Sequence, residues 1–170
     1  MVDRCGLSKV RTGRQVSTCA TCGAELGARE RCVDLLHDLT YRTLAHPKPA
    51  LFIHQYVVDA YAAQHAAENA KPITTAFALV GLYLFAEHGH TGREVQQAHM
   101  ALGRTKRRWP VFDVPSDRAD LTIADVLASA PGDAQDSAIE RWARSVWEIW
   151  KHERASVERL LREAKVLRGT

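Results

Sequence analysis

The sequence lacks the features by which several common classes of protein are recognised. No segment approaches the roughly 18–20 uninterrupted apolar residues that a bilayer-spanning helix requires, and the apolar stretch 77–85 is far too short. The positive charges near the N-terminus have no apolar run behind them, so the start of the chain does not resemble a secretory signal. We therefore expect a cytoplasmic protein without a membrane partner.

The motifs of the commonest enzyme families are also missing. The sequence contains no glycine-rich nucleotide fingerprint, no phosphate-binding loop, no GxSxG elbow and no HExxH pair. Internal repeats, low-complexity segments and strand-like alternation are absent as well. These absences exclude the most frequent enzyme classes and favour a helical protein.

Positive charge is in only small excess, with a formal net charge of +3. A dedicated nucleic-acid-binding protein usually carries more. One dense basic segment, `RTKRRW` at 104–109, could contact phosphates, but it is explained more simply as a helix end whose cations favour the negative pole of the helix dipole. We therefore do not expect a nucleic-acid partner.

The composition is that of a folded chain, because 46% of the residues are hydrophobic and 25% are charged. We expect a flexible N-terminus at 1–15 and a single helical domain at 16–170, which includes a zinc-binding segment at 16–32. The predicted fold class is all-α, a bundle of five to six helices. The helices are expected at 30–46, 51–69, 73–88, 93–107 and 134–166, with a short one between Thr122 and Pro131 and an extended strap at 108–120.

Prolines 47 and 49 end the first predicted helix, and the second begins almost at once. So short a connection makes these two helices antiparallel neighbours. The third, at 73–88, is apolar almost all round and is expected at the centre of the bundle.

Three of the four cysteines form a cluster typical of a zinc site. The segment `CATCG`, residues 19–23, places Cys19 and Cys22 in a CxxC turn with Gly23 after it, and Cys32 begins the apolar stripe of the first helix. Thiols stay reduced in the cytoplasm, so a disulfide is the least favoured interpretation. Free or redox-active thiols, with Cys32 as a small core residue, remain an alternative.

The antiparallel pair suggests the fourth ligand. Cys32 and His65 lie at roughly equal sequence distances from the turn near residue 48, so they should face each other. His54 is eleven residues from His65, roughly 16 Å along a helix, and cannot share its ion. We therefore predict a tetrahedral Zn²⁺ site formed by Cys19, Cys22, Cys32 and His65.

The remaining cysteine and several histidines are not expected in a site. Cys5 is expected to be an unbound thiol, and four histidines are expected at the surface: His37, His88, His90 and His99.

Several motifs together resemble a known family. They are `CATCG` at 19–23, Cys32 before `LLHDL`, `VVDAYAAQH` at 57–65, `LTIADVLA` at 121–128 and `WARSVWEIWKHE` at 142–153. The combination is similar to an uncharacterised family of small bacterial proteins classed as a domain of unknown function, over about residues 19–155. Members often carry two adjacent histidines late in the last helix, whereas here Glu153 follows His152. The resemblance implies a shared fold and no particular activity.

Two functional hypotheses follow. In the first, zinc is structural, because a Cys₃His set leaves no open position for water, and the protein is a binding or regulatory module for an unidentified small molecule or protein. In the second, it is a small metal-dependent enzyme with a pocket near His54, Asp59, Tyr61 and His152, whose side chains are suited to proton transfer and oxyanion stabilisation. Catalytic zinc, with one protein ligand lost to water, is a variant of the second.

The oligomeric state is suggested only by the tryptophans of the last helix. Residues 142, 147 and 150 occupy more than one face, which leads us to expect at least one at the surface, where it would form a homodimer contact.

Overall fold

The computed structural model describes residues 17–28, 30–46, 48, 51–66, 70–104 and 106–166. A hairpin of β1 (Ser17–Thr18) and β2 (Glu25–Leu26) precedes α1 (Cys32–Leu44), α2 (His54–Gln64), α3 (Pro72–His88) and α4 (Gly92–Gly103). After an irregular segment, the chain forms α5 (Ile123–Leu127), α6 (Asp133–Trp150), a 3₁₀ turn at Lys151–Glu153 and α7 (Arg154–Glu163). The predicted all-α class is confirmed, while Cys5 and the segment 1–15 lie outside the described residues.

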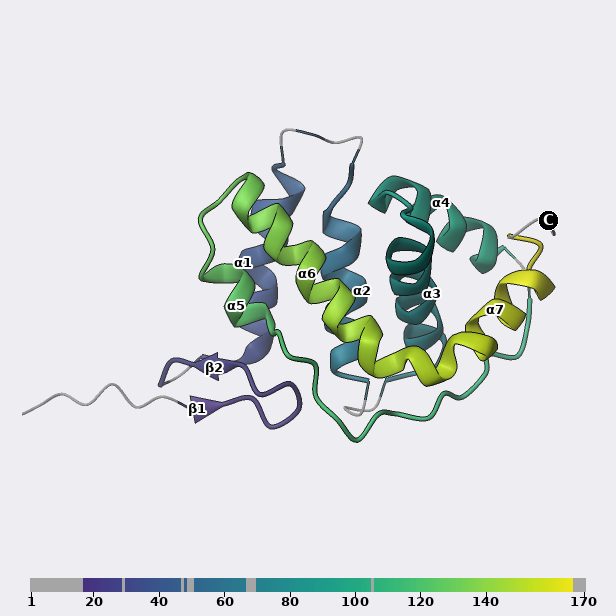
Figure 1. Cartoon of the computed structure of the whole chain (residues 1–170), viewed down its shortest axis with the longest axis horizontal. Coiled ribbons are helices and arrows are strands. Elements are labelled where there is room, and N and C mark those ends of the chain that lie inside the picture. Colours follow the sequence, from purple (N-terminus) through teal and green to yellow (C-terminus); the bar gives the residue numbers. More distant parts are fainter. Residues whose placement is uncertain are drawn as a thin grey trace, which may run out of the picture.

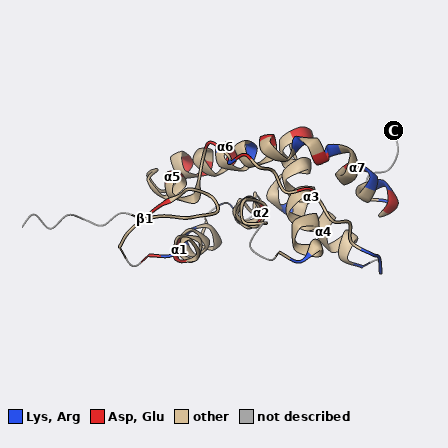
Figure 2. Cartoon of the chain, turned by 90° about the horizontal axis from the view of Figure 1, so that it is seen from below, with Lys and Arg blue, Asp and Glu red and all other residues tan. Residues whose placement is uncertain are grey.

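The helices form two layers. Seen from below, α5, α6 and α7 run across one side of the molecule and cover α1 to α4 (Figure 2). Helix α2 packs against α1, α3, α4 and α6, and so lies at the centre of the fold (Figure 1). Acidic and basic residues are interspersed along α6 and α7, as expected for helices with one face turned to water (Figure 2).

Helix α3 supplies much of the core. Ten of its residues are buried, which agrees with its nearly continuous apolar sequence. It ends at Gly89, whose φ of 67° closes the helix in the left-handed conformation that glycine adopts readily. Among the described residues, no helix combines the length and the apolar character needed to cross a bilayer.

Helix boundaries follow local capping. Thr91 and Glu94 form a capping box at the start of α4, with the Thr91 N–H donating to Glu94 Oε2 over 2.7 Å. A second capping box, formed by Thr122 and Asp125, lies at the start of α5, where the Thr122 N–H donates to Asp125 Oδ2 over 2.7 Å.

The prediction of one continuous helix over 134–166 is wrong. The helix is interrupted at Lys151–Glu153, where the strap that precedes α5 docks. Glu153 Oε1 accepts a hydrogen bond of 2.7 Å from the Asp113 N–H, and His152 Nε2 lies 2.8 Å from the Asp113 carbonyl oxygen. The two side chains thus hold both backbone polar groups of one strap residue, and the chain bends where they do so.

The expectation of an exposed tryptophan on the last helix is also wrong. Trp142, Trp147 and Trp150 are each at most 1% exposed, so none of them offers a surface for a dimer. Trp142 Nε1 donates to Gln64 Oε1 over 3.0 Å, and Gln64 Nε2 donates to the Leu121 carbonyl over 2.8 Å. The central helix, the strap and α6 are joined through this one amide.

Candidate metal centre

The two CxxC cysteines lie in the turn of the small hairpin. The strands pair antiparallel, with Ser17 opposite Leu26 and Thr18 opposite Glu25. In the turn, the Cys19 N–H donates to the Ala24 carbonyl and the Gly23 N–H to the Cys19 carbonyl, each over 2.9 Å. Gly23 has a φ of 82°, a conformation that disfavours residues with a side chain, so a glycine here allows the turn to close. No such strands were predicted, since two residues are too few to show alternation.

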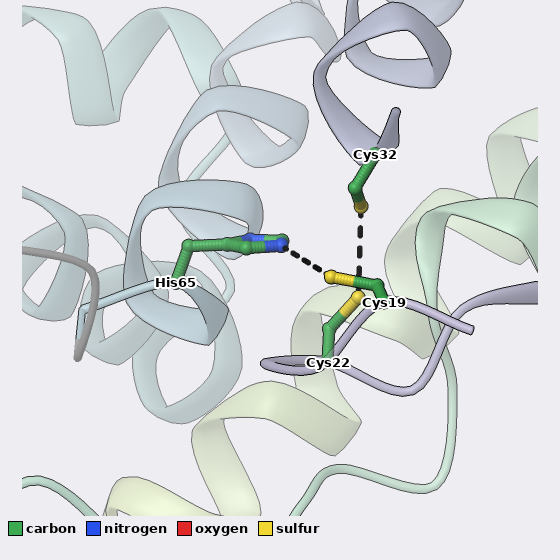
Figure 3. A group of neighbouring side chains, drawn as sticks. All are labelled: Cys19, Cys22, Cys32 and His65. Atoms are coloured by element: carbon green, nitrogen blue, oxygen red, sulfur yellow. Dashed lines mark hydrogen bonds between the residues drawn. The ribbon is translucent and has the colours of Figure 1, made fainter. Parts of the chain in front are cut away.

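The other two residues come from the antiparallel helix pair. Cys32 is the first residue of α1, and His65 is the residue at which α2 ends. Figure 3 shows the hairpin cysteines lying between them, with the imidazole directed at the Cys19 sulfur. The strap holds the turn from outside, because Arg118 Nη2 donates to the Ala20 carbonyl.

The distances fit a tetrahedral ion. The donor atoms of Cys19, Cys22, Cys32 and His65 all lie within 4.8 Å of one another, so the group could hold a metal ion. Zn–S bonds of about 2.3 Å and Zn–N bonds of about 2.0–2.1 Å at tetrahedral angles imply S–S edges of about 3.8 Å and S–N edges of about 3.6 Å. Cys22 Sγ lies 3.6 Å from Cys32 Sγ, and Cys19 Sγ lies 3.7 Å from His65 Nε2.

The imidazole is oriented as a metal ligand would be. His65 Nδ1 lies 2.9 Å from the Tyr61 carbonyl oxygen, which can only accept a hydrogen bond, so the proton sits on Nδ1. Nε2 is then available to the sulfur atoms. A backbone carbonyl that fixes the non-ligating nitrogen is a recurring feature around metal-bound histidines. The Tyr61 ring stacks on the imidazole with 4.0 Å between centroids and limits its rotation.

The sulfur and nitrogen atoms of the four-residue cluster are largely shielded from water. Cys22, Cys32 and His65 are 2%, 8% and 7% exposed, and Cys19 is half-buried. The contact with Cys32 lowers the pKa of the Cys22 thiol to about 4 against the effect of burial, and the same contact raises the pKa of Cys32. One proton is therefore shared between these sulfurs.

The same sulfur atoms change the pKa of the His65 imidazole. Burial lowers the pKa of His65, but the contacts with Cys22, the Tyr61 carbonyl and Cys19 outweigh it and raise this pKa to about 9. A divalent cation would replace these shared protons and neutralise the thiolates.

Three of the four residues proposed for a catalytic pocket, all but Asp59, are each held in another contact. His54 Nδ1 lies 2.9 Å from Thr43 Oγ1, which joins α2 to α1, and burial lowers the pKa of His54. The Tyr61 ring stacks on the His65 ring, and His152 Nε2 contacts the Asp113 carbonyl oxygen of the strap. Their catalytic role stays a prediction.

One buried histidine was missed. His99 was expected at the surface, but it is only 9% exposed. His99 lies on the same face of α4 as the buried residues Val95, Ala98 and Leu102. The helical spacing of these apolar residues in the sequence would have predicted that His99 is buried. Burial lowers the pKa of His99 to about 4.

Comparison with known proteins gives one match. The model of a family of unknown function, DUF5946, matches residues 17–151, which include the four residues of the cluster. No curated protein and no solved structure matches the chain.

Proposed function

Because the chain belongs to this family of unknown function, we propose a function from its own geometry: Cys19, Cys22, Cys32 and His65 bind one Zn²⁺ as a structural ion, and the folded protein is a binding or regulatory module. The observation that carries the proposal is the agreement of the S–S distance of 3.6 Å and the S–N distance of 3.7 Å with the edges of a zinc tetrahedron. Thiolate-rich sets of this kind favour zinc over hard cations.

A structural role is supported by what the four residues connect. The hairpin has only two short strands, and two-stranded hairpins are marginal on their own. An ion held by the hairpin turn, the start of α1 and the end of α2 would join the hairpin to the antiparallel helix pair. Four protein ligands also leave no position for a reactive water.

Metal analysis tests the ligand set. Purified protein should contain about one zinc per chain, and Cys32→Ser and His65→Ala should lose it. Cys5→Ser and His37→Ala are matched controls, since they remove the same side-chain types outside the cluster, and should keep the metal. Replacement of zinc by Co²⁺ should give the visible bands of a tetrahedral ion with thiolate charge transfer. Zinc retained in both ligand variants, or lost equally from the controls, would contradict the assignment.

Thermal unfolding tests the structural role. Cys32→Ser should lower the melting temperature relative to Cys5→Ser, and chelation should lower that of the wild type to a similar value. A variant that loses zinc and unfolds at the wild-type temperature would show that the ion does not stabilise the fold.

A further inference from the structure

Positive charge is concentrated at the end of the molecule opposite the hairpin. The segment after α4, residues 104–112, carries four cations and no acid, and the segment 154–165, which includes α7, carries four cations and two acids. Together these two segments have a formal net charge of +6, twice the +3 of the whole chain. The rest of the sequence is therefore net negative.

The fold brings the two basic segments together. Arg107 Nη1 donates to the Leu160 carbonyl of α7 over 3.3 Å, although the two residues are 53 positions apart in the sequence. Both segments lie at the same end of the molecule (Figure 2). The expectation of no nucleic-acid partner was drawn from residues 104–109 alone, and this charge is larger because α7 contributes to it.

The helix dipole does not account for the cations after α4. The helix was expected to extend to residue 107, where its cations would favour the negative pole of the dipole. Instead α4 ends at Gly103 and has no basic residue in its last turn. The effect of the dipole falls off within that turn, so it does not explain Lys106, Arg107 and Arg108, which lie beyond it.

Most of the exposed cations at this end are not neutralised by an acid. Glu158 Oε1 lies 2.9 Å from Arg154 Nε, and its Oε2 lies 3.6 Å from Arg162 Nη1, so one carboxylate serves two arginines. Five other exposed cations form no salt bridge within the part of the chain that the structure describes: Arg104, Lys106, Arg108, Arg159 and Lys165. Like charges held this close repel one another, and an anionic partner would relieve the repulsion.

A cavity lies between the two basic segments. Its volume is about 280 Å³, and it is lined by residues of the strap and of α7: Arg108, Trp109, Pro110, Val111, Ser156, Arg159, Leu160 and Glu163. Each segment thus contributes one arginine, and Glu163 is the only acid of the wall. Trp109 is half-buried and Val111 is 83% exposed, so apolar surface lies beside the positive charge.

This combination of features fits a single strand of nucleic acid. Its phosphates require several cations along their path, and its unpaired bases pack on aromatic and apolar side chains. A base that packs against Trp109 and Val111 would place its phosphates beside Arg108 and Arg159. A double helix keeps its bases paired and stacked inside, and cannot place one in the cavity.

From this arrangement we propose that the basic groove, formed by residues 104–111 and 154–165, binds single-stranded nucleic acid, with a base in the cavity and the phosphates along the exposed cations. The groove is independent of the zinc proposal, because it contains none of the four residues of the metal cluster.

Fluorescence anisotropy of the metal-loaded full chain with a labelled oligothymidine of about 15 nucleotides tests the proposal. The affinity should fall with salt, with a slope of log K against log salt of up to about −3.5 for five cations, and Arg108→Ala and Arg159→Ala should each reduce this slope by about 0.7. The double variant Arg108→Glu with Arg159→Glu should bind at least tenfold more weakly. Arg11→Glu with Arg14→Glu is the matched control, since it makes the same change of charge outside the groove, and should bind within about threefold of the wild type. Metal content should stay at the wild-type value in all variants.

An abasic strand of the same length and charge tests the role of the cavity. Stacking of a base on an aromatic side chain contributes about 1–3 kcal/mol, so the abasic strand should bind at least fivefold more weakly than the oligothymidine. Four results would overturn the proposal: no binding of the oligothymidine to the wild type, an equal loss in the two double variants, equal binding of the abasic strand, or a preference for vesicles of anionic lipid over the oligothymidine.

Discussion

Replacing Gly81 with alanine tests the packing of α3 against the Asp59 carboxyl group. The new Cβ would lie 2.6 Å from Asp59 Cγ, about 0.8 Å inside the 3.4 Å at which ordinary contact begins, and 3.1 Å from Val95 Cγ1. Overpacking of a buried site costs about 1–3 kcal/mol, whereas alanine gains about 1 kcal/mol of helix propensity over glycine. We therefore expect Gly81→Ala to destabilise the protein by up to about 2 kcal/mol.

A double-mutant cycle isolates the contact. In an Asp59→Ala background the carboxyl group is gone and only the Val95 contact remains, so Gly81→Ala should be close to neutral. The coupling energy should then be up to about 2 kcal/mol, measured by urea denaturation of the four proteins. Gly103→Ala is the control, since its Cβ would meet only Phe77 Cζ at 3.6 Å. An equal cost of Gly81→Ala in both backgrounds would refute the reasoning.

Three further predictions use the same structure. Burial raises the pKa of Asp59 well above its ordinary value, so its stabilising effect is complete below about pH 4 and is lost as the pH rises through the folded-state value. Wild type should therefore lose stability relative to Asp59→Asn as the pH rises from about 4 toward the folded-state pKa, at up to about 1.4 kcal/mol per pH unit, as denaturation at each pH would measure. Gly92→Ala should destabilise more than Gly103→Ala in urea, because its Cβ would meet the Phe52 carbonyl, a backbone group that cannot rotate away. Lowering free zinc from about 1,000-fold above its Kd to far below it should cost about 4 kcal/mol in the same assay.

The metal cluster could be predicted because it depends on regular geometry. Proline positions define the turn between α1 and α2, and helical periodicity then places Cys32 opposite His65. The structure brings the four predicted side chains together, with donor distances that the sequence could not supply.

Features that depend on tertiary contacts could not be predicted. Nothing in the periodicity of residues 134–166 marks the break at Lys151–Glu153, because it coincides with a contact to Asp113, about forty positions earlier in the chain. The prediction of an exposed tryptophan on α6 was likewise based on residue spacing alone. Other helices cover sides that an isolated helix would leave exposed: Trp142 Nε1 donates to Gln64 at the end of α2, and Trp147 Nε1 donates to Glu87 of α3. All three tryptophans are buried.

The polar residues of α2 are judged by one rule, that a buried polar group requires a partner. Gln64 satisfies it twice, with Trp142 and with the Leu121 carbonyl. His65 satisfies it at Nδ1 with the Tyr61 carbonyl and at Nε2 with the cysteine sulfur, in the geometry of a metal ligand. Asp59, although almost fully buried, has only the Gln55 amide, and one of its oxygens stays unpaired. The same accounting that directs His65 toward an ion marks Asp59 as the exception on α2, where burial raises the pKa of the carboxyl group and so favours its protonated form.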